Sequence, residues 1–181
     1  NDRQGAQRCL LDYPDLAAKD NDGRTLLMAV CERKDTHMVR NVLRVMQEQK
    51  CDANLRDKCG VCALALGVES RSVVAMLLQH GSLPDIADDT GTTPLMRACK
   101  AGSADSAELL LAAGACPRRV NSAGDAALNI ALKHGGGSTP LVELLKKSPA
   151  ASAPPLLQRR VVLGGLSARP ELNGRRGTAV S

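Results

Sequence analysis

The sequence predicts an all-α array of stacked helix-turn-helix units, and three observations support this. A glycine-centred phrase recurs at Gly23, Gly60, Gly91 and Gly124, with spacings of 37, 31 and 33 residues. A period in the low thirties is typical of stacked repeats. Apolar stripes with helical spacing follow each phrase. Phe and Trp are absent and Tyr13 is the one aromatic residue, which suits thin helix layers packed on Leu, Ala and Val.

The clearest repeat starts with the tight-turn sequence Asp88–Gly91, in which Gly91 supplies a backbone angle that other residues avoid. Thr93 stands at the N-cap of a short helix and Pro94 at its first position, where the missing N–H costs nothing. We expect this helix to end at Gly102. Its apolar face comprises Leu95, Ala98 and Cys99. A second helix from about Ala104 should end near Gly114 and bury Ala107, Leu110 and Leu111.

The second-helix stripe recurs in three other places. These are Val39, Val42, Leu43 and Met46; Val73, Val74, Leu77 and Leu78; and Leu141, Leu144 and Leu145. A helix pair this small cannot bury its apolar face alone, so neighbouring pairs must stack. Residues 1–19 fit the end of a preceding repeat, with Arg8–Leu11 in its second helix. We divide the rest into repeats over 20–56, 57–87 (shortened), 88–120 (the best match) and 121–148 (degenerate), followed by a tail over 149–181.

These motifs resemble the ankyrin repeat over roughly residues 7–147. The matching segments are Gly91-x-Thr93-Pro94-Leu95, Leu109–Ala115, Leu77–Gly81, and the connectors Asp52–Asp57 and Asp85–Asp88. The resemblance implies an ankyrin-repeat solenoid with β-turn or hairpin tips. It also implies a non-catalytic scaffold or adaptor that binds a protein partner and needs no cofactor.

The departures from the pattern have consequences. The first full repeat carries about four extra residues around Val45–Lys50, and Lys50 stands where later repeats have a closing glycine. The second is two residues short near Glu69–Ser72. Cys62 and Ala126 replace the capping Thr, and loss of such a cap typically costs about 1 kcal/mol. We therefore predict that the third repeat is the most stable and that the fourth frays first.

Charge and cysteine content narrow the class of protein. Residues 1–148 hold 19 Lys and Arg against 18 Asp and Glu, whereas the tail holds five Arg against Glu171. The near-neutral body argues against a nucleic-acid surface there. Seven cysteines, mostly in helix-face or turn positions, favour reduced thiols in the cytosol or nucleus. The sequence has no secretion signal and no membrane-length apolar run.

The two ends carry expectations of their own. The chain starts at Asn1, inside a repeat and without Met, so we expect a fragment of a longer protein. The tail is rich in Pro, Ala, Gly and Arg without a sustained period, which predicts disorder. Its apolar island, Pro155–Leu163, fits either a short docking motif or a stub that folds back on the last helix.

Three patterns with chemical meaning are explained better by the repeat than by catalysis. Cys59-Gly60-Val61-Cys62 is a C-x-x-C, but Gly60 is the turn glycine, Cys62 fills the capping position, and further zinc ligands are missing. Cys59 and Cys62 remain candidate reactive thiols. His134–Gly137 is similar to the oxyanion loop of some esterases, but the sequence contains no Gly-x-Ser-x-Gly nucleophile elbow. The three histidines fall in three different repeats. We therefore expect no enzyme, no catalytic residue and no metal site.

The ankyrin resemblance places partner binding on the turn tips and the adjoining first helices. The matching tip residues are Asn21, Asp22, Arg24, Lys58, Cys59, Val61, Asp89, Thr90, Thr92, Ser122, Ala123 and Asp125. The first helices add Met28, Glu32, Arg33, Glu69, Met96, Arg97, Lys100, Asn129 and Lys133. Arg24, Arg33, Arg97, Met28 and Met96 are the strongest candidates, because Arg offers a rigid fork of donors and Met adapts to apolar surfaces.

The sequence leaves three alternative functions open. A ubiquitin-ligase substrate adaptor would place a C-terminal box after the repeats, but such a box wants Cys where Arg160 stands. A cyclin-kinase inhibitor of the four-repeat type shares only the shortened second repeat. A thiol switch would use Cys59 and Cys62.

Overall fold

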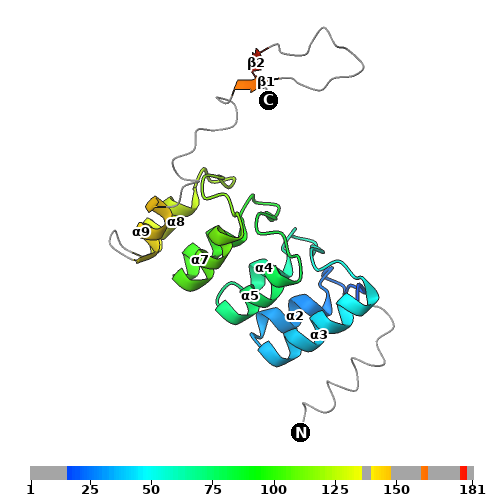
Figure 1. Ribbon diagram of the computed structural model, residues 1–181. Helices are drawn as coiled ribbons and strands as arrows, with labels where there is room; N and C mark the ends of the chain where they lie inside the picture. Colours follow the sequence, from blue (N-terminus) through cyan, green and yellow to red (C-terminus); the bar gives the residue numbers. More distant parts are fainter. Residues whose placement is uncertain (1–15, 136–139, 148–159, 163–175, 179–181) are drawn as a thin grey trace. The chain divides into compact units, whose positions relative to one another are not determined.

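The computed structural model describes residues 16–135, 140–147, 160–162 and 176–178. The chain divides into two compact units, 1–148 and 149–181. In its described part the first unit is built from helices alone (Figure 1). They are α2 (Leu26–Glu32), α3 (Thr36–Gln49), α4 (Ala63–Leu66), α5 (Arg71–Gln79), α6 (Pro94–Ala101), α7 (Ala104–Ala112), α8 (Ala127–Gly135) and α9 (Pro140–Lys147). The predicted all-α repeat fold is confirmed. The helix predicted at Arg8–Leu11 lies outside the described residues.

The helices of the first unit form two rows. The first helices α2, α4, α6 and α8 pack in sequence order, and so do the second helices α3, α5, α7 and α9 (Figure 1). Each first helix also packs on the second helix of its own repeat. The main helix contacts are therefore made within a repeat or between neighbours, as expected of a solenoid.

The core runs continuously through both rows. The predicted α3 stripe is fully buried, with Val39, Val42, Leu43 and Met46 each at most 3% exposed. Three leucines of the other predicted stripes are instead half-buried at the edge of their helices: Leu78 in α5, Leu111 in α7 and Leu144 in α9. Burial of one such aliphatic side chain contributes about 1.5–3 kcal/mol, so the repeats owe their stability to stacking.

The predicted helix caps differ from one repeat to the next. Thr25 and Thr93 each accept a hydrogen bond from the backbone N–H three residues on, at 3.4 and 3.3 Å. Cys62 makes no such bond, and α4, the helix that follows it, has four residues. The predicted insertion lengthens α3 to 14 residues, against nine in α5 and α7. Lys50 then closes α3 in the left-handed conformation, with φ 56°.

The second unit contains the strands β1 (Arg160–Val162) and β2 (Arg176–Thr178), which pair antiparallel with Val161 opposite Gly177. These six residues are the part of the tail that the structure describes, so the disorder predicted for the tail stays a prediction. The β-branched Val161 and Val162 favour an extended backbone, and the pairing joins residues too far apart for a local pattern to reveal. The rest of the tail, including most of the Pro155–Leu163 island, lies outside the described residues.

Candidate functional site

The four turn tips share one hydrogen-bonded construction. The first residue of each turn is Asp20, Asp57, Asp88 or Asn121, and its side-chain oxygen accepts the backbone N–H groups two and four residues later. In the third tip these bonds are 3.0 and 2.9 Å long. An Asx side chain used in this way fixes the turn locally, so each tip has a defined shape before any partner arrives.

Backbone hydrogen bonds also connect each tip to the next. Lys58 N–H donates to the Asp22 carbonyl at 3.1 Å, Asp89 N–H to the Cys59 carbonyl at 3.1 Å, and Ser122 N–H to the Thr90 carbonyl at 2.8 Å. The tips therefore form a continuous row along the array, which we call the tip row (residues 20–25, 57–62, 88–93 and 121–126).

Ion pairs fasten the tip row to the first helices. Arg24 Nη2 contacts Glu32 Oε2 at 2.7 Å, and Lys133 Nζ contacts Asp125 Oδ1 at 2.7 Å. In the third repeat Arg97 Nη2 contacts Asp88 Oδ2 at 2.8 Å. Burial opposes ionisation of Asp88, but hydrogen bonds from Thr90, Arg97 and two backbone N–H groups outweigh it and lower its pKa. Arg24, Arg97 and Lys133 are thus held in defined positions.

Most residues predicted to bind a partner are solvent-accessible, but three are not. The exposed ones are Asn21, Asp22, Arg33, Lys58, Cys59, Asp89, Thr90, Lys100, Ser122, Ala123 and Lys133, with Glu32, Glu69 and Asn129 beside them. Arg24, Thr92, Arg97 and Asp125 are half-buried. Met28, Met96 and Val61 are buried, at 0%, 1% and 8% exposure.

The expectation that Met28 and Met96 provide apolar contact surface is therefore corrected. Each stands three residues after a capping Thr, and its first helix packs against neighbouring first helices and its own second helix. Because each first helix has neighbours on several sides, more than one of its faces is buried. Met28 also completes a capping box, because its Sδ accepts the Thr25 N–H at 3.5 Å. Val61, which is 8% exposed, is likewise excluded from the accessible contact surface.

A hollow of about 500 Å³ lies beside the C-terminal end of the short helix α4. We call it the α4 hollow. Its lining comes from three successive repeats and comprises Glu32, Lys34, Ala65, Leu66, Val68, Glu69, Arg97, Lys100 and Ala101. α4 ends at Gly67. A Cβ at this position would lie only 2.6 Å from Val73 Cγ1, so a larger residue would clash there. The sequence signal for this feature is the shortening predicted near Glu69–Ser72, although the hollow itself was not predicted.

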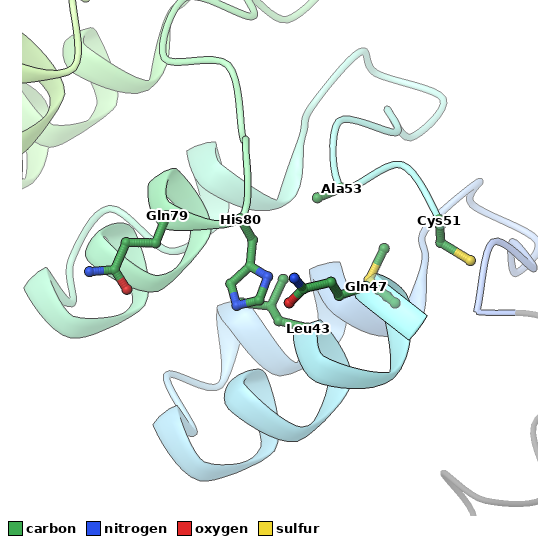
Figure 2. Close-up of a pocket in the computed structure, with 7 residues that line it drawn as sticks. Leu43, Gln47, Cys51, Ala53, Gln79 and His80 are labelled. Atoms are coloured by element: carbon green, nitrogen blue, oxygen red, sulfur yellow. The ribbon is translucent and has the colours of Figure 1, made fainter. Parts of the chain in front are cut away.

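A second hollow, of about 390 Å³, lies where the second helices α3 and α5 end. Leu43, Met46, Gln47, Cys51, Ala53, Gln79 and His80 line it. Figure 2 shows Gln47 from α3 and His80 beyond the end of α5, with the Gln79 side chain directed away from them. The long helix α3 contributes Leu43, Met46 and Gln47 to its wall. The lining carries amides, a thiol and an imidazole but no carboxylate, Lys or Arg.

The two candidate thiols differ in environment. Cys59 is exposed on its tip, whereas Cys62 is buried. Burial raises the pKa of Cys62, and burial likewise raises the pKa of Cys31 and Cys99 to about 12. The thiolate is the reactive form, so the structure argues against Cys62 as a nucleophile.

Metal-binding and membrane-spanning arrangements are absent from the described residues. No group of three or more His, Cys, Asp or Glu there is arranged to hold a metal ion. None of the described helices has the length and apolar character needed to cross a membrane. Of the His134–Gly137 motif, His134 and Gly135 end α8, and the last two glycines lie outside the described residues.

Known proteins share this repeat architecture. A family model described as ankyrin repeats in three copies matches residues 72–153. Ankyrin repeat domain-containing protein 63 from Homo sapiens and from Mus musculus are each 32% identical over 134 residues, which cover 71% of this chain and 35% and 34% of the relatives. The B-cell lymphoma 3 protein homolog of Mus musculus is 30% identical over 138 residues, covering 75% of this chain and 30% of that protein. The chain thus spans about a third of these relatives. Together with the helix pairs and tips described above, these matches show that the chain belongs to the ankyrin-repeat family.

Proposed function

We propose that this chain is a non-catalytic scaffold or adaptor that binds a protein partner through its tip row and the exposed residues of its first helices. Ankyrin repeats are protein-interaction modules. The observation that carries the proposal is the pre-organisation of the tip row, whose side chains are held by Asx turns, inter-tip hydrogen bonds and ion pairs. Little conformational entropy is lost when such a surface docks.

The composition of this face sets the expected affinity. With Met28, Met96 and Val61 buried and no Phe or Trp in the sequence, the face lacks the large apolar anchors that dominate tight interfaces. Its accessible groups are mostly charged and polar, with Leu132 on α8 a large apolar side chain that is exposed, at 41%. We therefore expect a dissociation constant of about 0.1–10 μM.

Affinity purification from cytosol tests the proposal. The bait is the full chain, beside a truncation to residues 1–148 and an Arg24→Ala/Arg97→Ala variant. A matched control, Arg40→Ala/Arg71→Ala, removes two exposed arginines from the second helices α3 and α5. We expect partners to bind the control and the truncation but not the first variant, with thermal unfolding confirming that all baits are folded.

Two outcomes oppose the proposal. Partners that depend equally on both arginine pairs would argue against a site on the first helices. Partners captured by the full chain and lost from 1–148 would move the binding element to the tail.

The cytosol or nucleus is the proposed compartment, supported by the six described cysteines, all of which are free thiols.

A further inference from the structure

We propose that the α4 hollow determines specificity by accepting an apolar side chain of the partner that is flanked by a carboxylate. This inference rests on the proposed function and narrows it to one place and one ligand chemistry. It draws on the volume of the hollow, the aliphatic residues in its lining and the balance of the charges around it.

The hollow is large enough for a side chain and has aliphatic residues in its lining. Ala65, Leu66 and Val68 contribute its aliphatic surface, and Ala101 contributes a methyl group from α6. The volume of about 500 Å³ falls within the range of ligand sites, about 300–1,000 Å³. An engineered apolar cavity of about 150 Å³ already holds benzene. One aliphatic or aromatic side chain therefore fits with room for its neighbour.

Both carboxylates on the rim are already used. Glu69 pairs with Lys34 across the first two repeats. Glu32 pairs with Arg24 at 2.7 Å. Each carboxylate at the hollow therefore already has an intramolecular cation beside it.

The cationic side of the rim has capacity left over. Lys100 is exposed and makes no ion pair within the described part of the chain. Arg97 already uses one Nη on Asp88, and its Nε–H is buried, out of reach of a partner. The unpaired charge at the hollow is thus the Lys100 ammonium, and its complement is a carboxylate.

Selection from a displayed library of random 12-residue peptides tests the inference and does not require the partner to be identified first. The full chain is the target. Selected peptides are then measured against Lys100→Gln, which removes the free charge, and Ala101→Gln, which places a larger side chain at the hollow. Lys146→Gln and Ala112→Gln are matched controls, because both positions are exposed on α9 and at the end of α7.

The expected peptides carry Asp or Glu next to Leu, Ile, Val or Phe. Their affinity should fall about three- to tenfold in Lys100→Gln, fall further in Ala101→Gln, and stay unchanged in both controls. Raising the ionic strength should weaken binding to the wild type more than to Lys100→Gln.

The contrary results separate this inference from the proposed function. Peptides whose affinity is unchanged in Lys100→Gln and Ala101→Gln but falls in Arg24→Ala would overturn binding at the α4 hollow. Binding through the tip row would then still stand. Peptides rich in Lys or Arg would overturn the assignment of charge. A failure to enrich any peptide, or enrichment of peptides sensitive only to the control positions, would overturn both proposals.

Discussion

The end of the second helix provides an internal comparison of backbone strain, and it leads to a reciprocal pair of substitutions. The same position is Lys50 after α3, Gly81 after α5 and Gly114 after α7, with φ of 56°, 83° and 93°. All three backbones are left-handed, a conformation that glycine adopts without steric penalty and lysine only at a cost. We expect Lys50→Gly to stabilise the chain and Gly81→Ala to destabilise it.

The magnitude follows from two opposing terms. A left-handed backbone costs a residue with a Cβ about 1–2 kcal/mol. Glycine recovers that cost but loses about 0.5–1 kcal/mol to the greater freedom of the unfolded chain. The Lys50 N–H keeps its bond to the Gln47 carbonyl, and its side chain is exposed. The net gain for Lys50→Gly is therefore about 0.5–1 kcal/mol.

The reverse change isolates the backbone term equally well. A Cβ at Gly81 or Gly114 would meet no atom within 4 Å. Gly81→Ala should therefore lose about 1 kcal/mol through φ alone.

Equilibrium unfolding in urea, monitored by circular dichroism, measures both variants. The midpoint should rise for Lys50→Gly and fall for Gly81→Ala, with unchanged slopes. A Lys50→Gly variant that is neutral or less stable, or a Gly81→Ala variant as stable as wild type, would refute the assignment of strain to this position.

Three further predictions concern single tips and repeats. Asp88→Asn keeps the turn bonds, as Asn121 does, but loses the Arg97 pair, so we expect about 0.5–1 kcal/mol lower stability at pH 7. Because folding lowers the pKa of Asp88, urea midpoints of the two chains should converge as pH falls below about 4; a constant gap would contradict this. In a Cys9→Ser background, Cys59→Ser should abolish the fastest reaction with Ellman's reagent, and Cys62→Ser should preserve it. Amide exchange should be slowest in residues 88–120 and fastest in 121–148; the reverse order would count against capping and stacking as its cause.

Local rules were enough for much of the fold. The Thr93 cap, the Pro94 helix start and the left-handed Gly102 end depend on neighbouring residues alone, and each lies where the sequence predicts it. The lengthened α3 and the weak start of α4 also follow from departures within one repeat. Such features are legible because the repeat supplies its own reference.

The binding face was less predictable, because it depends on how repeats meet. Helical periodicity marks one buried stripe, but Met28 and Met96 are buried by neighbouring repeats as well. The Arg24–Glu32 pair joins a tip to a helix eight residues away, a spacing that helix rules do not pair. The α4 hollow needs three repeats in register before it exists.

Amide hydrogen exchange of the full chain, with and without a partner obtained by affinity purification, tests the central claim most directly. Binding through the tip row and first helices predicts slowed exchange in residues 20–33, 57–69, 88–101 and 121–133, with α3, α5 and α7 unchanged. Protection confined to those three second helices, or to residues 149–181, would contradict the account.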